Sequence, residues 1–411
     1  NRRAGRRECR SPANHPGADM KNGWPIKTLG DVCERVTVGH VGITSPYYRD
    51  EGILFLRTQN VGKAGLVLDD MKFVTPEFHS SLKKSEVKAG DVLMSRVITH
   101  TVHCALIPPE LGPANCANVV LVRPAAGLLP EFLIYYIRSS EAQRHLLDRK
   151  VGSAQLVVNT KVVQTWPIPL PPLSEQRRIV GILDEAFEGL ATAKANAEQN
   201  LQNARALFES HLQAVFTQCG DGWKMEKLDT LTDLARGHNP PKSKFSREKK
   251  PGYVRFYQIR DGGTDDYTVY VPDTPQLHKM KKDDIMMVAY RHVGRAFRGV
   301  EGAFNVALCK ISNARRDLLD DDYLFHMIPS PFVKGELLKR SERSLIPSMS
   351  IEHLRELRIP LPPLIEQQNI VKLINSLSTE TQRLESLYQR KLAALDELKK
   401  SLLHRAFSGQ L

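Results

Sequence analysis

The chain has 411 residues, 41% hydrophobic and 25% charged, which is enough apolar material for several cores and excludes wholesale disorder. Its formal net charge of +12 favours an anionic partner such as nucleic acid. The run of about 18 apolar residues that a membrane span needs is absent, and no signal peptide opens the chain, so we expect a cytoplasmic protein with no membrane partner.

Residues 1–19 carry five arginines against Glu8 and Asp19 and show no apolar periodicity. This composition predicts a disordered extension, with Met20 as the expected biological start. A basic arm that touches DNA is the alternative.

The residue pattern of 20–166 predicts a first strand-rich domain. Short β-branched or aromatic runs at 52–57, 91–95 and 118–122 alternate with Gly, Pro, Asn and Asp turn signals, and the segment 131–147 looks helical.

Residues 167–222 begin with a proline strip and continue as a long helix. Pro169, Pro171 and Pro172 fix φ and remove backbone donors, which predicts a stiff, extended entry. We expect Ser174 to cap the helix and Glu175 to lie in its first turn, where the helix dipole favours a negative charge. Apolar residues then recur at steps of three and four from Ile179 to Val215. This period predicts a coiled-coil helix of about 40 residues, or roughly 60 Å.

The whole arrangement is then repeated, with a second strand-rich domain at 223–358 and a second proline strip and helix at 359–411. The segments 168–180 and 359–371 are identical at ten of thirteen positions, at an offset of 191. The offset holds without a gap from Glu131 and Asp322 to Phe216 and Phe407. A period this long indicates duplicated domains and a pseudo-two-fold molecule of the α+β class. Ile365 replaces the capping serine, so packing must hold the second helix start. We reject the strips as SH3-type ligands, because such ligands are not normally followed by a coiled-coil helix.

Two strand-rich domains, each followed by a strip and a heptad helix, together with the segments 90–96 and 402–411, closely resemble the specificity subunit of type I restriction-modification systems. The resemblance covers the chain from Met20 onward. It implies two target recognition domains that each recognise one half of a split, asymmetric site in double-stranded DNA. It also implies that the two helices pair antiparallel as a spacer, so that helix length fixes the gap between two major-groove readers.

The resemblance further implies partners. Two modification subunits, which bring S-adenosylmethionine and methylate adenine, dock on the helices and strips, and restriction subunits join through that assembly. The chain itself is then non-catalytic and needs no cofactor. The residues expected to contact the modification subunits are Pro171, Pro172, Glu175, Gln176, Pro362, Pro363, Glu366 and Gln367.

DNA readers require donors and acceptors on exposed loops, with arginine suited to guanine, Asn or Gln to adenine, and Lys, Ser or Thr to phosphates. For any single residue a plain solvated charge is the alternative. The clusters recur at comparable places in both halves, which favours DNA. The expected contacts are Tyr47, Arg49, Arg57, Gln59, Asn60, Arg96, Thr99 and His100 in the first domain, and Lys242, Lys244, Arg247, Tyr257, Gln258, Arg260, Arg291, His292, Arg295 and Arg298 in the second.

The domains also differ, which predicts that they recognise different sequences. The segment 283–288 replaces 90–95, and Gly294 follows Arg291 although no glycine follows Arg96 at the matching place.

Other chemistries are weakly supported. Asn239-Pro240-Pro241-Lys242 resembles the core motif of adenine methyltransferases, but lysine stands where an aromatic must stack on the flipped base. His100, His103 and Cys104 lack a fourth ligand, and the six cysteines form no CxxC pair, so neither a metal site nor a disulfide framework is expected.

Two alternatives remain. One is a self-sufficient DNA adenine methyltransferase or nuclease, which methyl transfer by the purified chain alone would reveal. The other is a coiled-coil scaffold unrelated to DNA, for which a gel shift in rising salt would find no salt-dependent binding.

Overall fold

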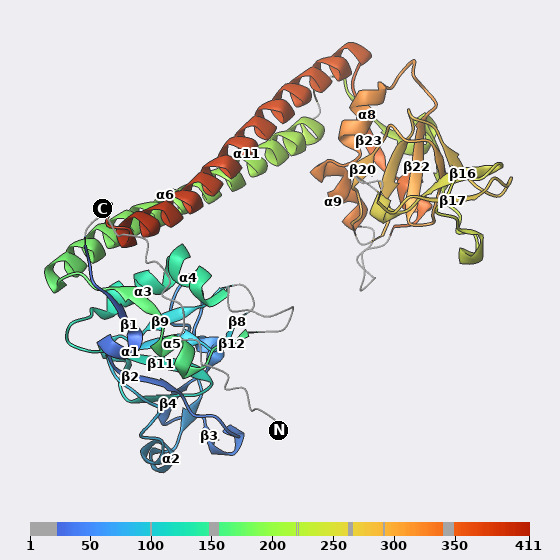
Figure 1. Cartoon of the computed structure of the whole chain (residues 1–411). Helices are drawn as coiled ribbons and strands as arrows, with labels where there is room; N and C mark the ends of the chain where they lie inside the picture. The colour runs from blue at the N-terminus through green and yellow to red at the C-terminus, as the bar shows by residue number, and fades with distance from the viewer. Residues whose placement is uncertain are drawn as a thin grey trace, which may run out of the picture. The chain divides into compact units, whose positions relative to one another are not determined.

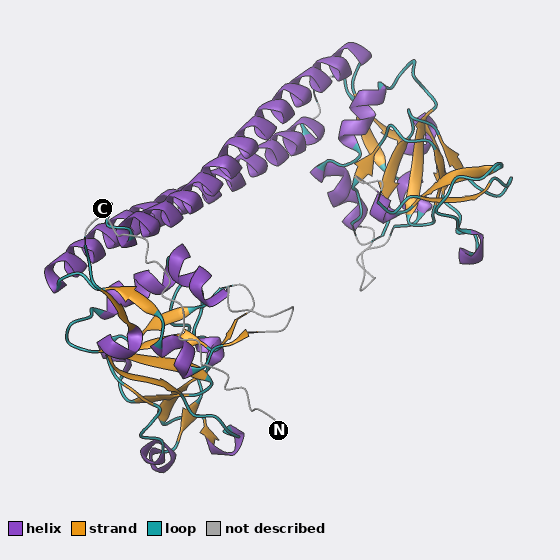
Figure 2. Ribbon diagram, viewed as in Figure 1, coloured by secondary structure: helices purple, strands orange, loops and turns teal. Residues whose placement is uncertain are grey.

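The computed structural model describes residues 23–98, 101–147, 156–218, 220, 222–261, 266–290, 292–339 and 349–411. The expected extension at 1–19 lies outside these residues. The chain forms two compact units, Asn1–Asn196 with Lys391–Leu411 and Ala197–Arg390, each of which is described by itself (Figures 1 and 2).

The first unit contains two main sheets. The four-stranded sheet has the order β2-β11-β7-β9, and the five-stranded sheet has the order β3-β5-β4-β10-β6. Two further pairs are β1 with β13 and β8 with β12. The strands are β1 (Ile26–Thr28), β2 (Cys33–Val38), β3 (Tyr48–Arg49), β4 (Ile53–Leu56), β5 (Phe73–Val74), β6 (Glu86–Val87), β7 (Val92–Ser95), β8 (Val97–Ile98), β9 (Cys104–Leu106), β10 (Ala114–Cys116), β11 (Val119–Pro124), β12 (Leu156–Val157) and β13 (Pro167–Pro169).

The second unit repeats most of this topology: its second sheet has four strands instead of five, and its described residues form no pair like β8 with β12. Its sheets have the orders β15-β22-β19-β20 and β17-β16-β21-β18, and β14 pairs with β23. In each domain one pair of neighbouring strands is parallel, β4 with β10 and β16 with β21. The strands are β14 (Lys224–Lys227), β15 (Thr232–Arg236), β16 (Tyr253–Tyr257), β17 (Val269–Pro272), β18 (Lys279–Met280), β19 (Ile285–Val288), β20 (Ala296–Phe297), β21 (Gly302–Phe304), β22 (Leu308–Asn313) and β23 (Arg358–Leu361). The predicted α+β duplication is confirmed.

Short helices cover the sheets at matching places. The predicted helical segments are confirmed, each broken once: α3 (Pro130–Arg138) and α4 (Ser140–Leu147) in the first domain, and α8 (Asp321–Met327) and α9 (Pro331–Lys339) in the second. The remaining short helices are α1 (Leu29–Val32), α2 (Pro76–Ser81), α5 (Thr160–Gln164), α7 (Leu228–Leu231) and α10 (Ile351–Arg355). No helix among the described residues is both long and apolar enough to cross a membrane.

Two long helices, α6 (Leu173–Thr217) and α11 (Leu364–Phe407), pack against each other (Figure 1). In the first unit Lys194 Nζ lies 3.0 Å from Asp396 Oδ1, and in the second Arg205 Nε lies 2.7 Å from Glu385 Oε1. These pairs give the helices an antiparallel register. Adding the repeat offset to Lys194 gives Glu385, and adding it to Arg205 gives Asp396, so one pair is the pseudo-symmetric copy of the other.

The predicted apolar seam of α6 is at least partly buried at all its positions, which are Ile179, Leu183, Ala186, Leu190, Ala193, Ala197, Leu201, Ala204, Phe208, Leu212 and Val215. On α11 one residue of the repeated apolar pattern, Leu398, is 48% exposed. Near its end α11 turns its apolar side toward the first domain, where Leu403, Ala406 and Phe407 join the core. A straight α-helix drifts from an exact 3.5-residue repeat, so its apolar side does not face the same neighbour along the whole helix, which accounts for the exposure of Leu398.

Each domain core is completed by the helix of the other repeat. Phe407, from α11, lies edge-on to Phe132 at 5.1 Å between ring centroids, and Phe216, from α6, lies edge-on to Tyr323 at 5.6 Å. All four rings are buried. The two repeats are therefore interlocked through their helix ends.

The proline strips are edge strands. Ile26 pairs with Pro169 and Met225 with Pro360, so each strip is fixed to the start of its own domain. The expected cap by Ser174 is wrong: α6 already begins at Leu173, and Pro172 O accepts the N–H of Glu175 at 2.9 Å. Glu175 and Glu366 do lie in the first turns.

Candidate nucleic-acid interface

The predicted contacts Arg57, Gln59 and Asn60 form a turn at the end of β4. Asn60 is buried, and its Oδ1 accepts the N–H of Arg57 at 2.9 Å. Arg57 Nη2 and Gln59 Nε2 donate to one carboxylate oxygen of Asp70, at 3.0 and 2.8 Å. The hydrogen bond from Arg57 holds the pKa of Asp70 below its usual range. These polar side chains therefore hold their own loop together.

The equivalent turn of the second domain is built in the same way. Asp261 Oδ2 accepts the N–H of Gln258 at 2.6 Å, as Asn60 does in the first domain. Tyr257 is buried, and the guanidinium of Arg260 lies 5.4 Å from the ring centroid of Tyr267. The recurrence of polar residues in the two halves, which favoured DNA contacts, is explained here by a shared turn.

The loop between β2 and β3 exposes apolar side chains. Tyr47 stacks on Phe78 with ring centroids 4.0 Å apart, and Arg49 Nη1 donates to the carbonyl oxygen of Pro46 at 3.1 Å. Val41 is 60% and Ile43 80% exposed. Arg49 is exposed, and of the cations predicted in this domain it is the best placed here to meet a phosphate.

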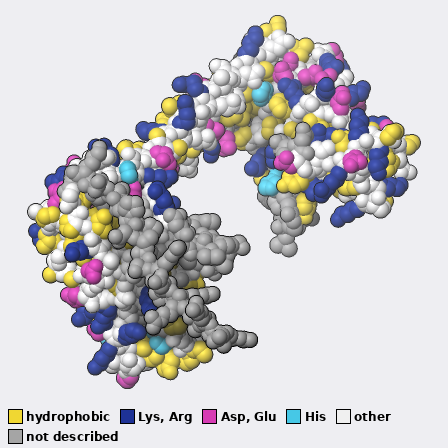
Figure 3. Space-filling view, viewed as in Figure 1, with side chains coloured by type: hydrophobic (Ala, Val, Ile, Leu, Met, Phe, Trp, Pro, Cys, Tyr) yellow, Lys and Arg dark blue, Asp and Glu magenta, His cyan; other side chains and the backbone are white. Residues whose placement is uncertain are grey.

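The loop in the same place in the second domain is basic. Lys242 and Lys244 begin and end a single 3-10 turn, and both are exposed, as is Arg247. Lys249 and Lys250, which the sequence analysis did not single out, are exposed on the same loop. Five cations against Glu248 suit an anionic polymer. Figure 3 shows basic and acidic side chains interspersed over the visible face of this domain.

A second basic feature lies between β19 and β20. His292 and Arg295 line an open groove of about 540 Å³ together with Lys334 of α9. Arg291 lies outside the described residues. The structure thus brings the predicted contacts His292 and Arg295 together. It adds Lys334, which nothing in the sequence distinguishes from other surface lysines.

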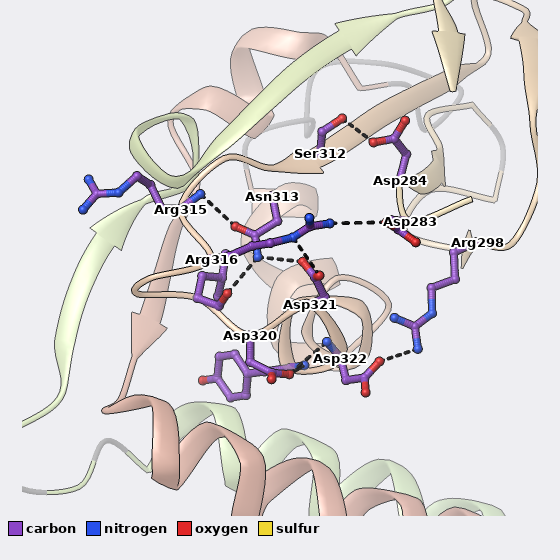
Figure 4. Close-up of polar contacts among 12 residues, drawn as sticks. Asp283, Asp284, Arg298, Ser312, Asn313, Arg315, Arg316, Asp320, Asp321 and Asp322 are labelled. Atoms are coloured by element: carbon purple, nitrogen blue, oxygen red, sulfur yellow. Dashed lines mark hydrogen bonds and ion pairs between the residues drawn. The ribbon is translucent and has the colours of Figure 1, made fainter. Parts of the chain in front are cut away.

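Arg298 belongs to a different environment, an acidic cluster at the start of α8 (Figure 4). Its Nη2 lies 2.5 Å from Asp322 Oδ1, and its guanidinium lies 4.3 Å from the ring centroid of Phe325. Arg316 bridges Asp321 and Asp283 beside it, at 3.0 and 3.4 Å. Because carboxylates surround Arg298, we do not carry it into the proposed interface.

Arg96 lies at the base of a two-stranded ribbon formed by β8 and β12. Its carbonyl oxygen accepts the N–H of Val158 at 2.8 Å. Thr99 and His100 lie outside the described residues. Val97 and Val157 are exposed on this ribbon, and polarity, the criterion applied to the sequence, does not detect them.

Groups suited to other chemistry are structural where they are described. Asn239 Oδ1 accepts the N–H of Val306 at 3.2 Å and so fixes a turn. Burial raises the pKa of the Cys33 and Cys116 thiols to about 12 and that of Cys309 to about 11, which keeps them protonated and unreactive. Among the described residues no group of three or more His, Cys, Asp or Glu side chains is placed to hold a metal.

The family model for the type I restriction modification DNA specificity domain matches residues 21–202 and again 220–391. The chain belongs to this family. The two matches coincide with the two repeats, and the chain is a DNA sequence specificity subunit, a non-catalytic recognition component of a type I restriction-modification system.

Relatives span almost the whole specificity subunit. The putative MjaX specificity subunit of Methanocaldococcus jannaschii is 20% identical and covers 96% of this chain and 95% of its own length. The EcoKI specificity subunit of Escherichia coli K12 is 22% identical, with 95% and 90% covered. A chain from a study of complex assembly and conformational transition in the type I system has a TM-score of 0.79 at 22% identity, covering 95% of this chain and 99% of that one. The HsdS subunit of Thermoanaerobacter tengcongensis has a TM-score of 0.64 at 21% identity, covering 96% and 99%.

The strips of this specificity subunit divide into buried and exposed residues. Gln176 is fully buried: its Oε1 accepts the N–H of Leu129 at 2.9 Å, and its Nε2 donates to the carbonyl oxygens of Gly127 and Pro171 at 3.0 and 2.8 Å. Gln367 repeats this arrangement with the N–H of Asp320 and the carbonyl oxygens of Leu318 and Pro362, at 2.7, 2.8 and 2.8 Å.

Both glutamines therefore lock the strips onto the domains. Pro171 and Pro362 are buried as well. Pro172 and Pro363 are exposed, and Glu175 and Glu366 are partly exposed, so of the residues expected to meet a partner these four present a surface.

Proposed function

We propose that each domain recognises one half of a bipartite, asymmetric DNA site. The observation that carries this proposal is a shared topology with different exposed chemistry. The same loop position exposes Val41 and Ile43 in one domain and Lys242, Lys244 and Arg247 in the other. Two readers with one fold and unlike surfaces suit two unlike half-sites.

The helix pair acts in this proposal as the spacer between half-sites. Helices α6 and α11 have 45 and 44 residues and an antiparallel register. A continuous helix has a fixed rise of about 1.5 Å per residue, so its length sets the gap in the DNA.

The exposed strip residues Pro172, Glu175, Pro363 and Glu366 dock two modification subunits in this proposal. Those subunits supply S-adenosylmethionine and the methyl transfer to adenine, and restriction subunits join through the assembly. Support comes from the pseudo-symmetry of the strips, which offers two similar surfaces to two copies of one partner.

Mapping N6-methyladenine in DNA from cells that express this chain with its modification subunits tests the proposal. We expect a bipartite motif with a fixed gap. A change in the loop 242–250 should alter recognition of one half only. A continuous motif, or a change that alters both halves together, would contradict the assignment of separate readers.

A further inference from the structure

The ribbon of β8 and β12 is a small sheet of its own, separate from the two main sheets of the first domain (Figure 1). Its strands are antiparallel, and Val97 lies directly opposite Val157. The base of the ribbon is well anchored: Val158, the next residue, is buried in the core, and Asn159 Oδ1 caps α5 by accepting the N–H of Val162 at 2.9 Å. The ribbon therefore has a fixed base.

Val97 and Val157 are 43% and 50% exposed. Residues directly opposite in an antiparallel pair share one face, so these valines form a single apolar patch. Isolated exposed valines need no explanation, but an exposed pair on an anchored ribbon favours a partner with an apolar group of similar size.

The surroundings of this patch favour an anionic partner. The two strands come from stretches, 92–109 and 149–174, that contain no aspartate or glutamate. Arg96 precedes β8, and exposed Lys161 follows β12 within α5. An apolar pair on two chain segments that carry cations and no carboxylate fits DNA better than the acidic cluster of Figure 4 does.

The major groove of B-DNA admits a two-stranded ribbon, and its apolar feature is the 5-methyl group of thymine. We propose that Val97 and Val157 contact a thymine methyl group in the half-site that the first domain recognises. This inference rests on the proposed function and names two specificity-determining residues that are not polar.

The second domain repeats the base of the ribbon but not its chemistry. Met349 donates to the carbonyl oxygen of Ala289 at 2.9 Å, as Val158 does to that of Arg96. Tyr290 follows Ala289 where Val97 follows Arg96. The thymine contact is therefore confined to one half-site.

The test uses the full chain with its modification subunits and duplexes that carry the mapped site. Each thymine in turn is replaced by deoxyuridine, which lacks only the methyl group. For the wild type we expect a loss of about fourfold in affinity at one or two positions of one half-site, the value for one buried methyl-sized group. The double variant Val97→Ser with Val157→Ser removes the γ-methyl groups of both side chains and should bind thymine and uracil duplexes equally in that half-site.

Two further variants sharpen the comparison. Val97→Ile stays apolar and should retain the preference for thymine. Leu207→Ser, at an exposed apolar residue of α6, should leave the preference unchanged. A serine double variant that still prefers thymine, a wild type with no preference, or two half-sites without thymine on either strand overturns the contact.

Two outcomes point to other failures. If the double variant no longer copurifies with the modification subunits, the ribbon is a protein contact and the inference is wrong. If the wild-type complex does not prefer the mapped site over a scrambled duplex, the proposed function itself is wrong. This measurement needs no valine variant, so it separates the two failures.

Discussion

In the first domain the loop after β2 exposes Val41 and Ile43, whereas in the second domain the loop after β15 exposes Lys242, Lys244 and Arg247. The equivalent helices α4 and α9 differ too. Gln143 of α4 holds both backbone groups of Val102, at 2.8 and 3.1 Å, while its equivalent Lys334 lines an open basic groove. One fold thus carries two unlike surfaces.

Contacts that join the long helices to the domains are, in contrast, nearly identical. Gln176 and Gln367 make three hydrogen bonds each to equivalent backbone groups, and Phe407 and Phe216 fill equivalent core positions. We call these contacts between a long helix and a domain the joints of the duplicated unit. The two repeats share their joints, whereas their exposed loops differ. We therefore expect joint variants to act on stability and loop variants on DNA binding.

The largest expected effect comes from the interlocked phenylalanines. Phe407→Ala should destabilise the first domain and Phe216→Ala the second, each by about 3–5 kcal/mol, because a buried ring leaves a cavity. Guanidinium denaturation with hydrogen exchange resolved by peptide measures both. If Phe407→Ala lowered protection only in the second domain, or Phe216→Ala only in the first, the exchange of helix ends between the repeats would be contradicted.

The buried glutamines come next. Gln176→Leu or Gln367→Leu leaves three backbone groups without their partner, and we expect a loss of about 1–3 kcal/mol in the free energy of unfolding. Gln368→Leu is the matched control, because this neighbour is exposed. Equal effects of the variants at 367 and 368 would mean that the hydrogen bonds of Gln367 do not stabilise the joint.

These joints also mark where the sequence was informative. The offset of 191 and the heptad pattern predicted the duplication and the two long helices, because both depend on periodicity, which sequence preserves directly. The antiparallel pairing of the helices was expected only from the resemblance to the family. The role of Gln176 was not predictable, because the residue type and its position after a proline strip do not show whether the side chain is buried or exposed. Asn60 was taken as a DNA reader for the same reason, since polarity alone does not distinguish a turn cap from a base contact. Val97 and Val157 were overlooked because pairing across β8 and β12 joins residues 60 positions apart.

The basic loop after β15 tests whether the exposed loops, which differ between the domains, contribute to DNA binding. Replacing Lys242, Lys244 and Arg247 by glutamine should weaken DNA binding and make its dependence on salt less steep by about 0.9 in the log–log slope for each phosphate contact removed. Lys372, Arg390 and Lys391 are exposed cations of α11, and their replacement by glutamine is the matched control. Titration of the assembled complex with DNA at several salt concentrations measures the slope, and equal slopes for the two triple variants would remove this loop from the interface.

The smallest effect is expected at the exposed ion pairs between the helices. Lys194 lowers the pKa of Asp396, so the pair stabilises the folded state at neutral pH, and this contribution is lost as pH falls through the lowered pKa of Asp396. Lys194→Glu alone places like charges together and should lower the denaturation midpoint slightly at neutral pH and less in acid. Lys194→Glu combined with Asp396→Arg recreates the chemistry of Glu385 with Arg205 at the pseudo-symmetric position, because those residues lie at the repeat offset. The double variant should therefore recover the wild-type midpoint. If it stays as unstable as the single variant, the two ends of the helix pair are not equivalent, and the shared joint would be limited to the strips and the core phenylalanines.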